Sequence, residues 1–249
     1  MQVEYIIQPD KQLGRVLTFL LESGPLPLRI VFVSAFVSVQ TLMRVKQQIL
    51  DLKEAGVDIR FVLGIDLGGT SCEVLSEVLS WEIDCRIVKH RLPGHTFHPK
   101  LYLFERENEA VIIVGSNNIT EGGFFGNYEG VAYIKYDLPG DAEDYANARS
   151  TLRRFLDPDD GPIVKPLTEK LIQELADRGD VPTEEGARKS RAALRKGQLT
   201  GRDKGKPIFG TENLDPPPPL PADLLERLIK NVRKQRSVAR KVSASGSSI

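Results

Sequence analysis

The chain has 249 residues, of which 41% are hydrophobic and 27% charged, and its formal net charge is zero. This balance is typical of an ordinary folded protein and excludes a wholly disordered chain. No apolar run reaches the roughly 18 residues that a membrane-spanning helix needs, and the N-terminus lacks the pattern of a secretory signal. Two cysteines, Cys72 and Cys85, are too few for a disulfide framework. We therefore expect a cytoplasmic protein with no membrane partner.

The charges are unevenly distributed along the chain. Residues 1–160 contain 16 Lys and Arg against 23 Asp and Glu, whereas residues 161–249 contain 18 against 11. This pattern predicts an acidic body with a basic tail. It favours nucleic-acid contacts made partly by the tail about as strongly as it favours a solvated, charge-rich tail.

The first 160 residues alternate between short β-branched runs and segments of helical periodicity. Strands are expected at residues 3–7, 28–36, 57–64, 84–89, 98–105, 110–115 and 128–136. Helices are expected after Asp10, after Ser38, at 72–79 and at 141–156. The order predicts an α/β fold with α/β/α layers around a mixed, largely parallel sheet, and a domain over residues 1–160.

The rest of the chain has a different composition. Residues 161–221 predict a helix at 167–176 followed by a charged linker, in which the proline-rich run 215–221 favours polyproline II. Residues 222–249 predict a basic helix with a frayed terminus. Of two strongly basic stretches, 188–206 is interpreted as solvated linker and 227–241 as a contact for DNA or another partner.

The residues that carry chemistry follow the predicted strands. His98 and Lys100 are two apart, so on a strand they point to the same side, and Asn118 and Glu129 end one strand and begin another. A lysine and an amide can hold phosphate oxygens and stabilise a pentacovalent state. An imidazole can attack phosphorus or protonate a leaving oxygen, and a carboxylate can fix its tautomer. Such a set needs no metal or cofactor, because the lysine supplies the positive charge.

The other histidines, His90 and His95, have no spacing to the cysteines that is typical of a zinc site, so no metal is predicted. His95 is expected near the mouth of the site. The run Gly68-Gly69-Thr70 lacks the lysine of a phosphate-binding loop and is interpreted mainly as a turn.

These motifs resemble the phospholipase D superfamily, in which H-x-K is followed by four residues and an Asp, and then by G-S-x-N. Here His98-Pro99-Lys100 is followed by Glu105, and Gly115 and Ser116 open the run that ends at Asn118. The stretch is most similar to the nuclease branch, which includes metal-independent restriction endonucleases and has a glutamate in an N-x-E context, matched by Glu129. Glu105 stands where the motif has Asp, so Glu105 and Glu129 are alternative supports for the histidine, with Glu129 favoured.

The resemblance implies a covalent phosphohistidine and a second histidine that protonates the leaving oxygen. Since this chain has one H-x-K motif, it implies a homodimer that shares one active site across a two-fold axis. The implied function is a DNA endonuclease in restriction or defence. Since the sequence contains no evident reader motif such as a helix-turn-helix or zinc finger, its specificity is expected in a region beyond Ile249, in the tail or in a partner protein. The alternatives are a phospholipase D or phosphatidyl transferase, and a non-catalytic nucleic-acid-binding module.

Overall fold

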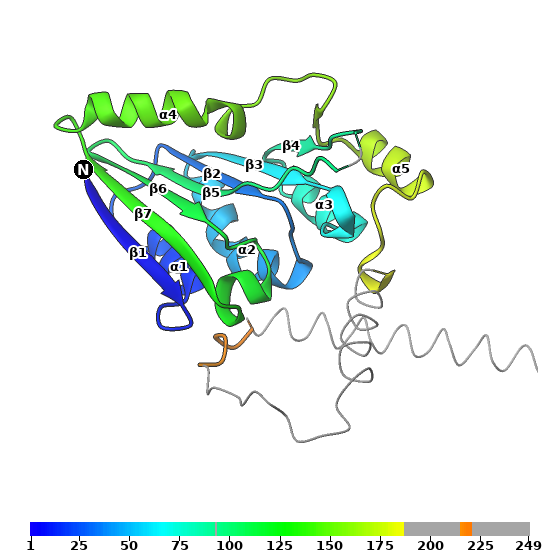
Figure 1. Cartoon of the computed structure of the whole chain (residues 1–249), viewed down its shortest axis with the longest axis horizontal. Helices are drawn as coiled ribbons and strands as arrows, with labels where there is room; N and C mark the ends of the chain where they lie inside the picture. The colour runs from blue at the N-terminus through cyan, green and yellow to red at the C-terminus, as the bar shows by residue number, and fades with distance from the viewer. Residues whose placement is uncertain (93, 187–214, 221–249) are drawn as a thin grey trace, which may run out of the picture. The chain divides into compact units, whose positions relative to one another are not determined.

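The computed structural model describes residues 1–92, 94–186 and 215–220 (Figure 1). The chain divides into two units, Met1–Pro216 and Pro217–Ile249, and all described helices and strands belong to the first. Residues 187–214 of the charged linker, the basic helix expected at 222–249 and both basic stretches lie outside the described residues. Residues 215–220 of the proline-rich run are neither helix nor strand.

The centre of the described fold is an eight-stranded sheet in the order β1-β7-β6-β5-β2-β3-β4-β8. Its strands are β1 (Gln2–Gln8), β2 (Arg29–Ser34), β3 (Asp58–Gly64), β4 (Asp84–Val88), β5 (Lys100–Glu105), β6 (Glu109–Gly115), β7 (Glu129–Asp137) and β8 (Val164–Pro166). The seven strands expected from the sequence are all present, with small shifts at their ends. The expected strand at 98–105 begins only at Lys100, so His98 precedes it.

The sheet is mixed, as predicted, but the prediction that it is largely parallel was wrong. Only the β2–β3 and β3–β4 pairs are parallel, whereas the five other pairs are antiparallel. One of these antiparallel pairs follows from the short connection between β5 and β6, which the amide of Arg106 closes by donating to the carbonyl of Glu109 at 2.8 Å. Strands joined by so tight a turn must run antiparallel, since a parallel pair needs a long crossover.

Helices cover both faces of the sheet and complete the predicted α/β/α layers (Figure 1). They are α1 (Leu13–Glu22), α2 (Val39–Glu54), α3 (Cys72–Ser80), α4 (Ala142–Leu156) and α5 (Glu169–Asp177), with short turns η1 (Asp66–Gly68) and η2 (Gly122–Gly126). The larger core lies between the sheet and α1, α2, α3 and α5, and the smaller core lies under α4. Alternation along β5 sends Tyr102 to the larger core and Leu103 to the smaller one.

Helix starts follow capping chemistry, with one departure from expectation. Ser38 caps α2 by accepting from the amide of Thr41, as the sequence predicts. Asp10, by contrast, does not cap α1, because Gln8 from the end of β1 accepts a hydrogen bond from the amide of Leu13 at 3.0 Å. A long-range amide side chain thus replaces the local carboxylate.

The compact part extends past residue 160, where the sequence pattern placed the end of the domain. β8 pairs antiparallel with β4, and α5 begins after Thr168, whose side chain accepts from the amide of Leu171. Leu167, Leu175 and Val181 belong to the larger core. The segment therefore contributes to the same fold rather than serving only as a linker.

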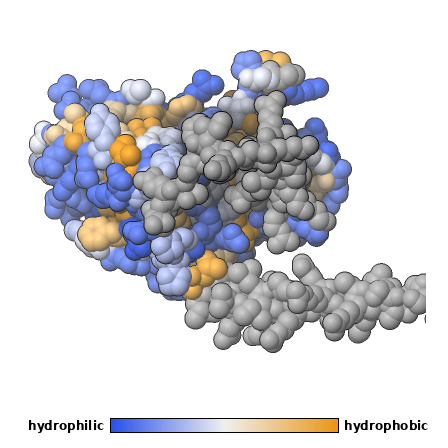
Figure 2. All heavy atoms as spheres, turned by 60° about the horizontal axis from the view of Figure 1, so that its bottom comes forward, coloured by the Kyte–Doolittle hydropathy of each residue, from blue (hydrophilic) through white to orange (hydrophobic). Residues whose placement is uncertain are grey.

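Within the described residues, no helix combines the length and apolarity that crossing a membrane requires. On the face turned forward in Figure 2, hydrophilic side chains predominate outside the grey atoms, and apolar side chains form small separate groups.

Candidate active site

The predicted site residues gather at the edge of the sheet where β5 begins, β6 ends and β7 begins. Leu101 at the start of β5 pairs with Val114 near the end of β6, and Gly115 pairs with Val131 near the start of β7. Antiparallel pairing therefore brings together segments that lie up to about thirty positions apart in sequence. Lys100 and Glu129 are both on the side of the sheet that faces the larger core, as the alternation with Tyr102 and Val131 requires.

His98 and Lys100 form the centre of this site. The Lys100 Nζ lies 2.6 Å from His98 Nδ1 and 2.9 Å from Nε2, and it donates to the His98 carbonyl at 2.8 Å. The Lys100 side chain is buried, while His98 is exposed and packs its ring edge-on against Phe36, with ring centroids 5.8 Å apart. The geometry fixes the imidazole at the surface with the ammonium beneath it.

The environment lowers the pKa of both groups. Desolvation, and then the positive charge of Lys100, hold the pKa of His98 below its ordinary value. Burial also lowers the pKa of Lys100, and the opposite charge of Glu129 partly counteracts this effect. Within the described residues, no carboxylate is hydrogen-bonded to the His98 ring. The site therefore favours a neutral imidazole, which is the form that can attack phosphorus.

Asn118 is held by its oxygen, which leaves its nitrogen available. Its Oδ1 accepts from the backbone amide of Phe36 at 3.0 Å and from the hydroxyl of Ser34 at 3.4 Å. Because both partners donate, the atom of the amide group that faces them is its oxygen. The Asn118 Nδ2 has no hydrogen-bond partner within the described part of the chain, so it can donate to a phosphate oxygen.

Glu129 is anchored on both oxygens, but not by the histidine. Ser116 Oγ donates to Oε2, and Asn127 Nδ2 donates to Oε1 at 3.0 Å. Ser116 is itself fixed, because its hydroxyl accepts from the amide of Gly130 at 3.1 Å. The electrostatic partner of Glu129 in this arrangement is Lys100, whose charged form it favours. Ser116 therefore supports the site through Glu129.

Glu105 lies at the wrong end of β5 to support His98. It pairs in register with Arg29, whereas Lys100 pairs with Ser34 at the other end of β2. Its carboxylate accepts hydrogen bonds from Tyr145 and, at 2.6 Å, from Arg149 of α4. The structure excludes the alternative in which Glu105 takes the place of the motif carboxylate beside the histidine.

Gly115 and Gly123 allow segments of the chain to approach each other closely. A Cβ on Gly115 would lie 2.2 Å from the carbonyl oxygen of Gly130, and one on Gly123 would lie 2.2 Å from that of Asn118. Both contacts are too short for any other residue, so these glycines keep β6, β7 and the Asn118 loop together.

Sequence reasoning missed three residues that position the site. Ser34 accepts from the amide of Ile119 at 3.0 Å, and Phe36 supplies the amide that holds Asn118. Gln8 accepts from the Asn117 side chain at 3.2 Å and donates to the Asn127 carbonyl at 2.9 Å. A buried serine at the end of an apolar strand is a signal in the sequence, but the role of Gln8 depends on contacts more than 100 residues apart.

The other histidines stand apart from the Lys100 contact. His90 and His95 lie with their ring centroids 5.0 Å apart on the loop that leads to β5. Among the residues that the structure describes, no group of three or more His, Cys, Asp and Glu is arranged to hold a metal ion.

Comparison with known proteins gives weak overall similarity to several solved structures. Nuc of Salmonella typhimurium, described as a phospholipase D family member, is 19% identical over 62% of this chain and 95% of its own, with a TM-score of 0.44. NucT of Helicobacter pylori is 13% identical over 63% and 96%, with a TM-score of 0.46. Phosphatidylserine synthase of Haemophilus influenzae is 14% identical over 79% of this chain and 46% of its own, with a TM-score of 0.46.

No curated protein matches the sequence. Residues 29–148, however, match the protein family described as "Cardiolipin synthase, PLD-like domain". This range contains His98, Lys100, Asn118 and Glu129, the four predicted catalytic residues. Over this range, just under half of its length, the chain is similar to the PLD-like domain of the phospholipase D superfamily.

Proposed function

We propose that this protein is a metal-independent endonuclease that cleaves DNA through a covalent phosphohistidine in a site shared by two identical subunits. The observation that carries the proposal is the contact between the exposed His98 and the buried Lys100. The lowered pKa of His98 favours its neutral form, and the Nδ2 of Asn118 has no hydrogen-bond partner among the described residues. A nucleophile and two donors for phosphate oxygens thus lie at one edge of the sheet. The basic stretches 188–206 and 227–241 of the sequence supply charge suited to a polyanion.

The proposed reaction has two displacements. The neutral imidazole of His98 attacks phosphorus, the P–O bond to the leaving group breaks, and the leaving oxygen takes a proton from His98 of the partner subunit. The partner's His98, now neutral, then takes a proton from water as that water attacks phosphorus and breaks the P–N bond. Lys100 and Asn118 stabilise the extra negative charge of both pentacovalent states. Each histidine ends in the protonation state in which it began.

The dimer is part of this proposal because one subunit has only one His98-Lys100 pair. An exposed apolar strip, formed by Val3, Tyr5, Ile7 and Val114, is the proposed contact surface. Tyr5 and Val114 both pair with Ala132 on β7, so the strip crosses three neighbouring strands on one sheet face.

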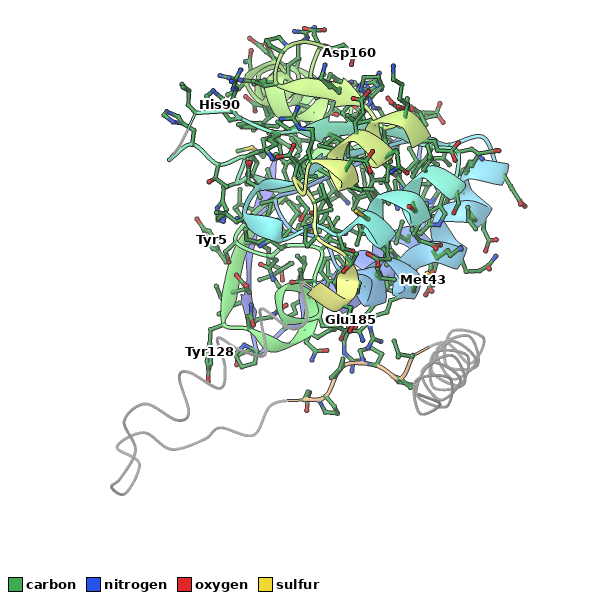
Figure 3. The ribbon with its side chains drawn as sticks, turned by 90° about the vertical axis from the view of Figure 1, so that its right-hand side faces the viewer. Tyr5, Met43, His90, Tyr128, Asp160 and Glu185 are labelled. Carbon is green, nitrogen blue, oxygen red and sulfur yellow. The ribbon has the colours of Figure 1, made fainter. Side chains whose placement is uncertain are left out.

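The strip also leads to the site. Ile7 pairs with Gly130, whose amide donates to Ser116. In the view of Figure 3, Tyr5 and Tyr128 project from the same side of the molecule as His90. The strip lies on the face of the sheet opposite to Lys100 and Glu129, because Tyr5 and Ile7 alternate with Ile6 of the larger core. A second copy docked on the strip therefore approaches the site at the sheet edge, where Ile7 pairs with Gly130.

The direct test is incubation of plasmid DNA with purified protein in EDTA. We expect nicking or cleavage that His98→Asn abolishes, and a dimer in analytical ultracentrifugation. Tyr5→Asp should weaken the dimer and the activity together, while Phe19→Asp, which changes an equally exposed aromatic residue on α1, should do neither. Intact DNA with the wild-type protein, or cleavage by His98→Asn, would refute the proposal.

A second candidate function is phosphatidyl transfer or phospholipid hydrolysis. It is favoured by the family match, whose description includes cardiolipin synthase, and by the same exposed apolar strip, which lipid chains can contact. Release of headgroup from phosphatidylcholine or phosphatidylglycerol vesicles, dependent on His98, would establish this function in place of the nuclease.

A further inference from the structure

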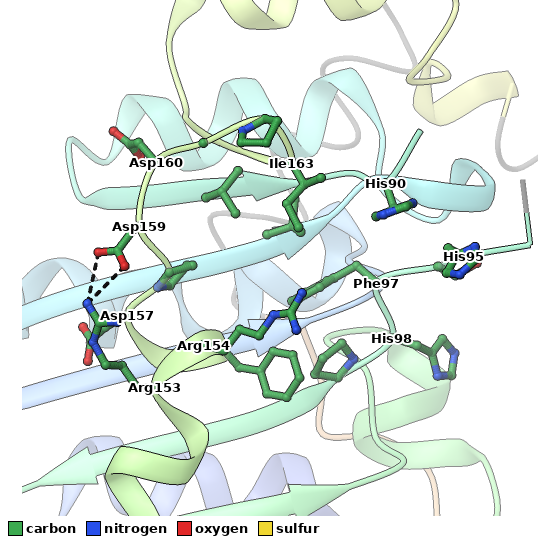
Figure 4. A pocket seen from close by; sticks show the side chains of 18 of the residues that line it. His90, His95, Phe97, His98, Arg153, Arg154, Asp157, Asp159, Asp160 and Ile163 are labelled. Atoms are coloured by element: carbon green, nitrogen blue, oxygen red, sulfur yellow. Dashed lines mark hydrogen bonds and ion pairs between the residues drawn. The ribbon is translucent and has the colours of Figure 1, made fainter. Parts of the chain in front are cut away.

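A cleft of about 1100 Å³ opens directly beside His98 (Figure 4). One wall is the loop 94–99, which ends in His98 and Pro99, and the other is the C-terminal half of α4 with the segment that follows it. Binding sites for small molecules have volumes of roughly 300–1000 Å³, so the cleft has room for a group the size of a nucleotide. Because the cleft begins at His98, the candidate nucleophile, a part of the substrate bound in the cleft lies next to the reacting phosphate.

Of the two arginines that line the cleft, one is not paired with a carboxylate of the described residues and can bind a phosphate. Each lining carboxylate is already paired with an arginine: Asp157 with Arg60 at 2.7 Å, Asp159 with Arg153 at 3.1 Å and Asp160 with Arg86 at 3.2 Å. Arg154 has no acidic partner among the residues described. In Figure 4 its side chain extends from α4 toward the loop that carries Phe97. An arginine in this position can bind a phosphate with two parallel hydrogen bonds.

The same cleft has an aromatic wall. Phe97 and Phe155 contact each other edge to face, with ring centroids 6.1 Å apart, and both are half-buried and line the cleft. A nucleobase can stack on such rings whatever its identity, and proteins that bind single strands combine stacking with a cationic groove. Arg154 and Phe155 both line this cleft, so a phosphate site and a stacking site belong to the same cleft.

We propose that this cleft binds the nucleotides of a single-stranded polynucleotide that flank the scissile phosphate, with Arg154 on the backbone and the Phe97–Phe155 wall against a base. The proposal rests on the nuclease function proposed above and names its preferred substrate. A single strand is favoured because its bases are free to stack on the Phe97–Phe155 wall, whereas the bases of a double helix are stacked on their neighbours. The paired charges along the walls make the cleft a poor place for acyl chains.

The test compares a long and a short phosphodiester. The substrates are a fluorescein-labelled 12-nucleotide single-stranded DNA and bis(p-nitrophenyl) phosphate, which is too small to occupy the cleft and the catalytic centre together. Arg154→Gln should lower kcat/KM for the oligonucleotide at least about tenfold more than kcat/KM for the small diester. Arg154→Lys should recover part of the loss, because it restores the charge without the planar guanidinium. The control is Lys170→Gln, which removes an exposed charge from α5 that does not line the cleft.

Measuring the binding of the oligonucleotide tests the proposal independently of catalysis. In the His98→Asn background, Arg154→Gln should weaken binding of the labelled oligonucleotide at least about fivefold and reduce the slope of log K against log salt concentration by about 0.7. Equal binding and an unchanged slope would overturn the cleft proposal, as would equal losses on the two substrates. A wild-type protein that cleaves neither substrate would overturn the nuclease function, while the binding result would still decide whether the cleft holds a single strand.

Discussion

Asn118 offers a test in which the fold and the chemistry can be separated. Its Oδ1 has a structural task, since it accepts from Phe36 and Ser34, while its Nδ2 is free for substrate. Asn118→Asp keeps an acceptor for both donors but replaces the free donor by a negatively charged oxygen. Asn118→Ala removes both functions. The pair of variants therefore distinguishes loss of the loop from loss of the phosphate donor.

The expected magnitudes differ accordingly. Removing one donor to a developing oxyanion costs about 100- to 1000-fold in kcat, or about 2.7–4 kcal/mol, and Asn118→Asp adds charge repulsion to this loss. Its melting temperature should change little. Asn118→Ala should lose similar activity and also about 1–3 kcal/mol of stability, because the amide of Phe36 is left without its acceptor. For a domain of this size that corresponds to a fall in Tm of about 2–4 °C per kcal/mol.

The assay is cleavage of labelled DNA, in parallel with thermal unfolding followed by circular dichroism. Asn118→Ser serves as the control, since its hydroxyl can still donate to phosphate, and it should retain more activity than Asn118→Asp. If Asn118→Asp cleaved DNA at the wild-type rate, the assignment of Nδ2 as a phosphate donor would be wrong.

Three further predictions concern the groups around the nucleophile. Lys100→Met should raise the pKa of His98, measured by NMR titration and assigned with His98→Asn, because a repelling charge is removed; an unchanged pKa would contradict the Lys100 contact. Since the pKa of His98 lies below its ordinary 6.5, the protonated form required to release the leaving group is lost as pH rises through this lowered value, and kcat/KM should be highest below pH 6.5. Glu129→Gln should lower kcat strongly, whereas Glu105→Gln should lower stability but leave kcat near wild type, and the reverse outcome would restore Glu105 as the supporting carboxylate.

The layered fold was accessible from the sequence because its strands are apolar runs and its helices have clear periodicity. Strand direction was not accessible, since alternation is the same in parallel and antiparallel strands. The three-residue β8 is too short to give a pattern, and only its pairing with β4 makes it a strand. The end of the compact part was therefore placed too early.

The candidate site was predictable to the extent that it is local. The two-residue spacing of His98 and Lys100 survives in the structure even though His98 precedes the strand. The choice between Glu105 and Glu129 required geometry, because five residues of extended chain carry Glu105 about 16 Å from Lys100, while β7 returns Glu129 to the same edge. The contacts of Gln8 and Phe36 depend on tertiary packing and have no local signature.

The central claim is that two His98 side chains, one from each subunit, serve one scissile bond. A heterodimer of wild-type and His98→Asn chains, isolated through two different affinity tags, tests it directly. With a shared site, this heterodimer retains less than about one hundredth of the wild-type activity, because every site lacks either the nucleophile or the acid. Activity near one half of wild type, or failure of the two chains to associate at all, would contradict the account.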